Sequence, residues 1–397
     1  MLVLVVNAGS SSLKYQLLDM TDESVLAKGN CDRIGIDGHI SHKAKGLSVE
    51  EDVSFPTHTE AFAKLVEVLT TGDAKVIDDL SQIKAIGNRI VQGGDVFRET
   101  VIVTDEVIDK IDALAEIAPV HNHGAALALR ACKSVMPDVP MTVVFDTAFH
   151  QTIPEKAYMF GLPYEDYEQY HVRKYGFHGT SHRFVSAAVA DAMGRDVKDL
   201  KIVTCHLGNG SSISAVKNGQ VIDTTMGFTP LDGLLMGTRC GAVDPSAITY
   251  VMEKRGLTPS QMAEYMNKKS GLLGISGVSS DNRDVSKAAA EGNKRAALAN
   301  EMLKYQVKKY IGAFMAAMNG ADAIVFTGGI GENDAPTREG ACEDMENLGI
   351  KLDTELNKTI RGKLMKISAP DSKVEVWVVP TNEELLIARD TLALVTK

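Results

Sequence analysis

The chain has 397 residues, of which 44% are hydrophobic and 24% charged, and its formal net charge is −10. This length exceeds what one compact core usually organises, so two or three domains are expected. The acidic balance excludes a typical nucleic-acid-binding protein, and any anion must be bound by a local basic site. Only five apolar residues stand between Met1 and Asn7, too few for an export signal or a membrane span. We therefore expect a cytoplasmic protein that binds neither nucleic acid nor membrane.

The cysteines exclude two further kinds of site. There are five of them, and each stands alone in the sequence without a Cys-x-x-Cys pair. Neither a disulfide framework nor a cysteine-based zinc site is predicted from this spacing. We expect unreactive thiols in a reducing compartment.

The first half of the chain alternates strand and helix patterns. Continuous apolar runs bounded by turn residues predict strands, and apolar residues at helical spacing predict helices. In chain order these patterns predict a strand at 2–7, its hairpin partner at 13–19, a helix at 59–69, and strands at 83–94 and 141–150. Asp146 falls near the carboxyl end of the last strand. The alternation predicts an α/β architecture.

The sequence pattern of the first residues recurs near the midpoint of the chain. Segment 201–227 repeats the opening, with a strand, a glycine, consecutive serines and a second strand. Gly9 and Gly208 occupy the same place in the two copies, 199 residues apart. This predicts one duplication of a large unit, with a ligand cleft between two similar lobes. Further elements are predicted as helices at 181–194, 246–255, 259–269, 284–318 and 381–395, and strands at 323–333 and 373–380.

Three glycine-rich turns, at 9–12, 206–210 and 328–333, follow predicted strands. Glycine lets the backbone approach a phosphate closely, and successive N–H groups with hydroxyls form an anion-binding nest. A single turn of this kind is also typical of an ordinary hairpin. Two in equivalent places of a duplicated chain, with a third, indicate phosphate bound from both lobes. The sequence has no P-loop, complete G-x-G-x-x-G or protein-kinase motif.

Three arginines and one aspartate stand in surroundings that favour anion chemistry. Arg89, Arg239 and Arg283 lie among glycines, apolar residues and small polar residues. A guanidinium there suits bidentate binding of a carboxylate or phosphate, and a structural ion pair is the equal alternative. Asp146 at its strand end suits a magnesium ion or the orientation of a reactant, and a turn or helix cap is the alternative.

Two further candidates lie beside predicted helix starts. His178 precedes a helix for which Thr180 or Ser181 is the expected N-cap, and this leaves a functional and a structural interpretation equally open. At the last helix, Thr381 begins a predicted capping box. Glu383 is left over from that box and is a candidate ligand for Mg²⁺.

Eight ordered motifs together resemble one known family. They are NAGSSSLK, FDTAFHQT, YGFHGTSH, HLGNGSS, MGTRCGAVDP, SGLLGISGVSSD, FTGGIGEN and PTNEEL. The chain is similar over its whole length to the acetate kinase family, within the superfamily of acetate and sugar kinases, heat-shock chaperones and actin. The resemblance implies two duplicated ribonuclease H-like (actin-like ATPase) lobes. The N-terminal lobe is expected at 1–150 with the final helix at 384–397, and the nucleotide-binding lobe at 151–383.

The resemblance also implies roles for individual positions. Magnesium-site residues are Asn7 and Glu383, with Mn²⁺ able to replace Mg²⁺. The expected catalytic residues are Asp146, His178 and Arg239. Arg89 is the substrate-carboxylate position, and an apolar pocket for the methyl group is expected from Val91, Val120, Phe177 and Pro230. ATP contacts are expected from Ser10, Ser12, Lys14, His206, Leu207, Gly208, Asn209, Gly210, Asp281, Asn282, Arg283, Gly329, Ile330, Gly331, Glu332 and Asn333.

Five positions depart from the pattern that the family usually shows. They are Asn88, Gln92, His123, Ala242 and Asn282. None is a proposed catalytic residue. Asn88, Gln92 and His123 flank the substrate side, so they bear on affinity more than on the reaction.

The implied reaction is reversible, direct in-line transfer of the γ-phosphoryl group of Mg-ATP to acetate, giving acetyl phosphate and ADP, by a homodimer. Two alternatives are kept: a kinase for propionate or butyrate, and a chaperone-like or filament-forming ATPase. The chemistry supports the kinase, because two anions must meet and Arg89, Arg239 and His178 would offset their charge.

Overall fold

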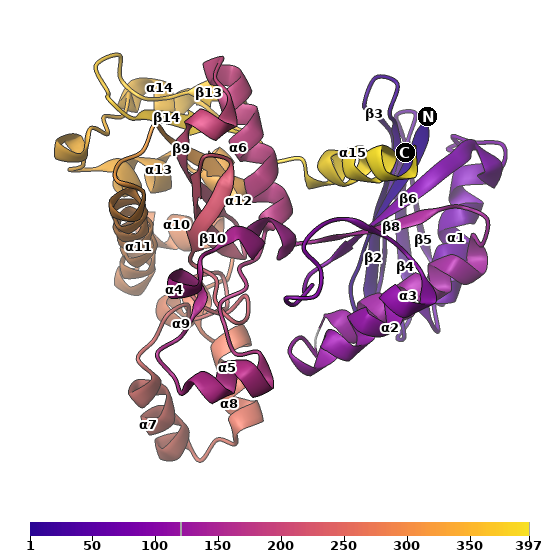
Figure 1. Ribbon diagram of the computed structural model, residues 1–397, viewed down its shortest axis with the longest axis horizontal. Coiled ribbons are helices and arrows are strands. Elements are labelled where there is room, and N and C mark those ends of the chain that lie inside the picture. The colour runs from indigo at the N-terminus through magenta and orange to yellow at the C-terminus, as the bar shows by residue number, and fades with distance from the viewer. Residues whose placement is uncertain (120, 397) are drawn as a thin grey trace. The chain divides into compact units, whose positions relative to one another are not determined.

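The computed structural model describes residues 1–119 and 121–396, and it divides into two compact units. Unit 1 comprises Met1–Ala148 and Asn382–Lys397, and unit 2 comprises Phe149–Thr381 (Figure 1). The last helix therefore belongs to the unit that begins the chain, and it brings Glu383 with it. No helix among the described residues is both long and apolar enough to span a bilayer.

Unit 1 is built on an eight-stranded sheet with the order β5-β4-β3-β2-β1-β6-β8-β7. The neighbours β1, β6 and β8 are parallel, and every other pair is antiparallel. The strands are β1 (Leu2–Ala8), β2 (Ser12–Asp19), β3 (Ser24–Asp32), β4 (His39–Ala44), β5 (Leu47–Asp52), β6 (Ile83–Ile90), β7 (Val101–Ile102) and β8 (Met141–Phe145). The helices are α1 (His58–Thr70), α2 (Asp105–Ala113), α3 (Asn122–Val135) and α15 (Glu383–Val395), with short 3₁₀ turns at Leu80–Gln82 and Leu114–Glu116.

Helices cover the centre of the sheet of unit 1 because its central strands β1, β6 and β8 are largely buried. Leu4 and Val6 share a core with α1 and α3, and α15 packs along β1, β6 and β8 (Figure 1). Gly87 permits the close approach of α15, since a Cβ atom there would lie 2.4 Å from Thr391 Oγ1 and 2.7 Å from Ile387 Cγ2. The start of α15 is thereby placed near the carboxyl ends of the parallel strands.

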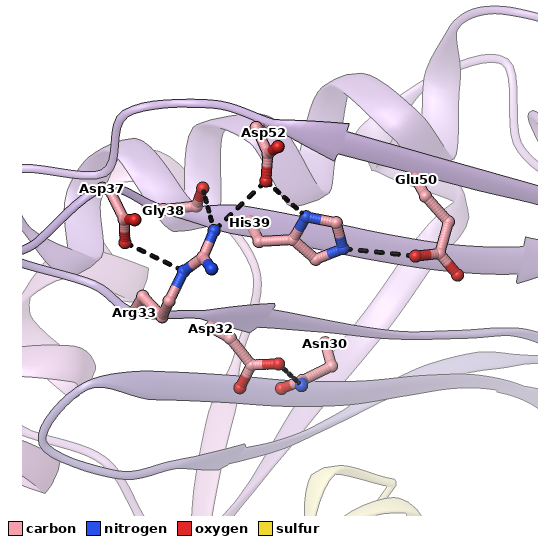
Figure 2. Close-up of polar contacts among 8 residues, drawn as sticks. All are labelled: Asn30, Asp32, Arg33, Asp37, Gly38, His39, Glu50 and Asp52. Atoms are coloured by element: carbon pink, nitrogen blue, oxygen red, sulfur yellow. Dashed lines mark hydrogen bonds and ion pairs between the residues drawn. The ribbon is translucent and has the colours of Figure 1, made fainter.

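The free edge of this sheet is strongly charged. Arg33 contacts Asp37 and Asp52 at 2.9 and 3.1 Å, and His39 contacts Asp52 and Glu50 at 2.8 and 3.2 Å (Figure 2). All of these carboxylates are well exposed. Charged side chains on an edge strand disfavour pairing with another chain, so this network protects the edge at β5.

Unit 2 is built on a six-stranded sheet with the order β11-β10-β9-β12-β14-β13. Its strands are β9 (Lys201–Leu207), β10 (Ser211–Lys217), β11 (Gln220–Thr224), β12 (Ala323–Thr327), β13 (Met365–Lys366) and β14 (Glu375–Val378). Its helices are α4 (Glu155–Tyr158), α5 (Tyr164–Tyr170), α6 (Gly179–Met193), α7 (Pro245–Arg255), α8 (Pro259–Lys268), α9 (Gly271–Ser276), α10 (Asn282–Ala290), α11 (Lys294–Met318), α12 (Gly328–Asn333), α13 (Ala335–Cys342) and α14 (Thr354–Thr359). Short 3₁₀ turns lie at Ala148–Thr152, Val197–Asp199 and Glu346–Leu348.

Alternate residues of β9 face two separate cores. Val203 and Cys205 pack in the core that includes α11, whereas Ile202 packs in the core that includes α6. A strand covered on both faces has a continuous apolar sequence rather than an alternating one, which accounts for the pattern of 201–207.

The two units share one topology, and this confirms the predicted duplication. In unit 1 the order β3-β2-β1-β6-β8 contains two antiparallel pairs followed by two parallel pairs, and β11-β10-β9-β12-β14 does the same in unit 2. The cross-strand pair Asn7–Lys14 corresponds to the pair His206–Ser212. Equivalent backbone positions thus carry different side chains.

Several predicted elements are longer than the observed ones. The strands expected at 83–94 and 141–150 end at Ile90 and Phe145. The helical tract expected at 284–318 is two helices, because Gly292 adopts a φ of +95° and Asn293 caps α11. The strand expected at 323–333 ends at Thr327, and the chain turns into α12 through Gly328, whose φ is +75°. A Cβ atom at Gly328 would lie 2.7 Å from the carbonyl oxygen of Leu207. An apolar run alone could not reveal either turn.

Candidate functional site

Unit 1 gathers three polar residues at the carboxyl ends of its parallel strands. Asn7 is near the end of β1, Arg89 near the end of β6, and Asp146 directly follows β8. Because these strands are parallel neighbours, their carboxyl ends lie on the same edge of the sheet, where ligands bind in open α/β folds. The topology therefore brings together residues that are up to 139 positions apart in sequence.

Arg89 is held by its neighbours at this edge. Its Nε donates to Asp146 Oδ1 at 3.0 Å and its Nη2 to Asp146 Oδ2 at 2.5 Å, a bidentate pair. Nη1 donates to Asn7 Oδ1 at 3.3 Å. Burial acts to lower the pKa of Arg89, but Asp146 and Glu383 outweigh it and raise the pKa above its ordinary value. Arg89 is thus a fixed, permanently charged group.

Glu383 lies in the first turn of α15, with Oε2 3.9 Å from Arg89 Nε. Burial, opposed by Arg89, raises its pKa to about 7. The capping box predicted from Thr381 is wrong: Asn382 is the N-cap, with its side chain accepting from Leu385 N. The Thr381 N–H instead donates to Glu332.

The oxygen atoms at this edge fit a hard cation in part. Glu383 offers a carboxylate and Asn7 an amide oxygen, and a cation would relieve the repulsion between Glu383 and Asp146. Among the described residues, no three His, Cys, Asp or Glu side chains converge as a metal cage. Mg²⁺ usually takes one or two carboxylates and completes its shell with phosphate and water, so such a cage is not needed.

Ser10 lies in the turn between β1 and β2, and Ser12 and Lys14 lie in the first residues of β2. The Gly9 N–H donates to Ser12 O at 2.8 Å, and His58 Nε2 lies 2.8 Å from Gly9 O. Ser10 and Lys14 are exposed. The backbone of this turn is therefore held by hydrogen bonds, whereas the side chains of Ser10 and Lys14 face solvent.

Unit 2 contains a cavity of about 740 Å³. Eight of the residues expected to contact ATP line it: Gly208, Asn209, Asp281, Asn282, Arg283, Gly329, Ile330 and Asn333. Three lining residues were missed by the sequence reasoning: Ser280, Asp334 and Arg361. Ser280 and Asp334 adjoin predicted segments, but nothing in the sequence around Arg361 indicates that it lines a cavity, since only the fold brings it there.

The other predicted ATP contacts of unit 2 are not among the residues that line this cavity: His206, Leu207, Gly210, Gly331 and Glu332. Glu332 accepts hydrogen bonds from the N–H groups of Gly328 and Thr381 at 3.0 and 3.1 Å, which ties α12 in place. The carbonyl oxygen of Gly331 accepts from the fully buried Arg338 at 3.0 Å. Leu207 is completely buried in the core.

His178 occupies a backbone conformation that is uncommon for a residue with a side chain. Its φ is +58°, and it is itself the N-cap residue of α6, without a side-chain capping bond. The N-cap predicted at Thr180 or Ser181 is wrong, because both lie inside the helix. Residues held in this region often mark functional sites. The His178 ring stacks on His206 with centroids 4.3 Å apart.

Arg239 is a half-buried cation. Its Nη1 approaches Pro230 O at 3.4 Å and Met236 Sδ at 3.9 Å, and it forms no ion pair among the described residues. Burial lowers its pKa. A Cβ atom at Gly210 would lie 3.3 Å from Arg239 Nη1 and 3.5 Å from His178 Nε2, so both groups converge on one open glycine. This convergence suits an incoming anion.

The residues expected to form the methyl pocket are divided between the units. Val91 is half-buried in unit 1, while Phe177 is buried in unit 2 and Pro230 is half-buried there. Val120 lies outside the described residues. This pocket therefore stays a prediction.

Three residues that depart from the usual family pattern, Asn88, Gln92 and His123, form contacts within unit 1. Asn88 Nδ2 donates to Thr142 O at 3.1 Å, and Gln92 Oε1 accepts from Gly94 N at 2.9 Å. His123 is exposed and pairs with Asp112 at 2.8 Å. Each of these side chains is accounted for by contacts within unit 1.

The duplicated sheets and the polar ends of their central strands define an α/β protein of the actin-like ATPase class. Residues 2–389 match the Acetokinase family, and the chain belongs to that family. It is 54% identical to the acetate kinase of Dictyoglomus turgidum, over 100% of this chain and 98% of the relative. The crystal structure of Porphyromonas gingivalis acetate kinase is similar, with a TM-score of 0.97, 46% identity and 99% of each chain covered. A propionate kinase from Francisella tularensis has a TM-score of 0.92, with 38% identity and 99% of each chain covered.

Proposed function

We propose that this protein transfers the γ-phosphoryl group of ATP to acetate, reversibly, giving acetyl phosphate and ADP. The observation that carries the proposal is the convergence of Arg239 Nη1 and His178 Nε2 on Gly210. These are two groups able to donate to one anion, beside a glycine-rich turn, in a chain that belongs to the acetokinase family. ATP is accordingly a substrate.

The reaction needs charge neutralisation more than proton transfer. Acetate is ionised at neutral pH, so its oxygen attacks without a general base. Arg89 would bind the acetate carboxylate, and its bidentate pair with Asp146 fixes its orientation. Arg239 and His178 would donate to the equatorial oxygens as the phosphoryl group becomes planar. Asp146 acts on this account by positioning Arg89 and does not abstract a proton.

A divalent cation belongs to the proposal. Asn7 and Glu383 would hold Mg²⁺, or Mn²⁺ in its place, whose charge offsets that of the β- and γ-phosphates. Repulsion from Asp146 contributes to the raised pKa of Glu383, and a bound cation would relieve this repulsion and favour the ionised carboxylate.

We also propose a homodimer as the working form. Helix α7 contributes no buried residue to unit 2. Tyr250 on this helix is 61% exposed, and Val243 just before it is 44% exposed. Apolar side chains in such a position are typical of a surface that a partner subunit covers.

The test is formation of acyl phosphate, trapped with hydroxylamine, from ATP and Mg²⁺ with acetate, propionate, butyrate or no acid. A strong signal with acetate and a weaker one with propionate is expected, because one methylene usually changes specificity by about 10–200-fold. Preference for propionate would change the substrate within the same reaction, and the resemblance to a propionate kinase makes that comparison necessary. ATP hydrolysis independent of any acid would overturn the proposal.

A further inference from the structure

Unit 2 contains a buried chain of hydrogen bonds that ends at His178. His178 Nδ1 lies 2.9 Å from Ser212 Oγ, and the same hydroxyl lies 2.8 Å from His182 Nε2. His182 Nδ1 in turn lies 2.7 Å from Thr204 Oγ1. Ser212, His182 and Thr204 are completely buried. The chain joins α6 to β9 and β10 and runs from the core to a residue of the proposed site.

The chain has only two possible directions, because each hydroxyl carries one proton. Ser212 lies between two imidazole nitrogens, so it donates to one and accepts from the other. His182 is completely buried, and burial lowers its pKa well below the ordinary value, so it is neutral and carries one proton. The orientation of the Thr204 hydroxyl therefore decides the position of every other proton.

The distances select one direction. The other acceptor available to Thr204 Oγ1 is Ser214 O at 3.4 Å, long for a hydroxyl bond, whereas His182 Nδ1 is at 2.7 Å. Thr204 therefore donates to His182 Nδ1, and His182 Nε2–H donates to Ser212. Ser212 then donates to His178 Nδ1, which leaves the proton of a neutral His178 on Nε2.

Two groups beside His178, Arg239 and His206, agree with this neutral form. Arg239 brings its guanidinium to the same side of Gly210 as His178 Nε2. His206 stacks on the ring, and its Nδ1 is engaged with Ser181 Oγ at 2.8 Å. A second proton on His178 would be repelled by Arg239, whereas a neutral ring with a proton on Nε2 still donates.

We propose that Ser212 and His182 are positioning residues that keep His178 neutral with its proton on Nε2, aimed at the transferred phosphoryl group. This inference rests on the proposed function, which gives His178 that role. The consequence is a hydrogen-bond donor that is ready at neutral pH without first being protonated.

The direct test is nitrogen NMR of the full-length protein with ¹⁵N-labelled histidine, with the His178 signals assigned by their loss in His178→Gln. The expected wild-type spectrum at neutral pH shows a protonated Nε2 and an unprotonated Nδ1. In Ser212→Ala the His178 signals should shift toward a mixture of tautomers. A wild-type His178 that is protonated on Nδ1, or doubly protonated, would overturn the proposal.

Kinetics supply the second test, with Ser214→Ala as the matched control. Ser214 is also a buried serine of β10, and its hydroxyl contacts His150 instead, at 3.0 Å. Ser212→Ala should lower kcat about tenfold, the equivalent of one lost hydrogen bond, and Ser214→Ala should not. Adding Ser212→Ala to His178→Ala should cause no further loss.

The outcomes separate the two proposals. An unchanged kcat in Ser212→Ala, with His178→Ala strongly impaired, would refute the positioning role and leave the kinase assignment intact. Absence of acyl phosphate formation by the wild type would refute the kinase assignment, and the NMR spectrum would still decide the tautomer.

Discussion

The two units have the same strand order at their centres but carry different chemistry at equivalent positions. Where unit 1 has Asn7 opposite Lys14, unit 2 has His206 opposite Ser212. In unit 1, Arg89 lies between the carboxylates of Asp146 and Glu383. Unit 2 instead has glycine turns, buried hydroxyls and Arg239, which forms no ion pair among the described residues. The duplication thus supplies equivalent backbone positions at the strand ends, and the side chains at these positions differ between the two units.

The largest expected effect lies in unit 2. Arg239→Gln should lower kcat on the order of 10²–10³-fold, the usual cost of removing an electrostatic stabiliser of a transition state. Steady-state kinetics with acetate and ATP measure it. Arg195→Gln is the matched control, because Arg195 is an exposed arginine of the same unit that pairs with Asp322. Equal activity of the two variants would show that Arg239 plays no part in the reaction.

In unit 1, the substitution Asp146→Asn should affect the binding of acetate rather than that of ATP. Asp146→Asn removes the charge that orients Arg89, so the KM for acetate should rise about tenfold while the KM for ATP stays within a few-fold. The comparison of both KM values at saturating cosubstrate is the measurement. A variant with wild-type kinetics would remove Asp146 from the mechanism, and a selective loss of kcat would instead favour direct contact with the reacting group.

Substitutions at two glycines of unit 2 test whether ATP binds in the cavity. Gly329 and Gly312 both have open space where a Cβ atom would stand, but only Gly329 lines the cavity. Gly329→Val should raise the KM for ATP several-fold by occupying space needed for close backbone approach. Gly312→Ala, within α11, should leave kinetics unchanged and stabilise the fold by about 0.5–1 kcal/mol. Unchanged nucleotide affinity in Gly329→Val would place ATP elsewhere.

Glu383 should make the stability of the protein depend on pH and Mg²⁺. Its folded pKa of about 7 exceeds the ordinary 4.5, so the folded state holds the proton more tightly. The associated stability is complete below about pH 4.5 and is lost as pH rises through about 7, amounting to about 1–3 kcal/mol. Thermal denaturation of the wild type and Glu383→Gln across this range measures it. Above pH 7, Mg²⁺ with nucleotide should stabilise the wild type more than Glu383→Gln, because only the wild type offers the carboxylate to the cation.

The smallest effect is expected at the sheet edge shown in Figure 2. Hydrogen bonds with Asp52 and Glu50 raise the pKa of His39. Its contribution to stability is therefore complete below its ordinary pKa of 6.5 and is lost as pH rises through the higher folded value. His39→Gln should melt slightly lower than the wild type at acidic pH and together with it at alkaline pH. Added salt should shrink the difference, and a difference that persists at high pH would contradict this account.

Much of this molecule could be predicted from the order of its residues. The apolar runs at 2–7 and 201–207 and the turns beginning at Gly9 and Gly208 indicated the duplication, because a strand buried on both faces and a glycine turn are local patterns. The ordered motifs indicated the family for the same reason, since each is a short contiguous segment. The breaks at Gly292 and Gly328 could not be placed, because helix and strand patterns continue through a glycine whose φ only the packing fixes.

Tertiary structure decided how the candidate residues interact. Arg89 and Asp146 are 57 positions apart, and parallel strand pairing alone makes them a bidentate pair. The packing of α6 on β9 and β10 places Ser212 between His178 and His182. His178 is also the N-cap residue of α6, which no local pattern indicated. Sequence determines which chemical groups are present and the local conformations available to them. The direction and neighbours of each group depend on long-range pairing of segments, which no local pattern records.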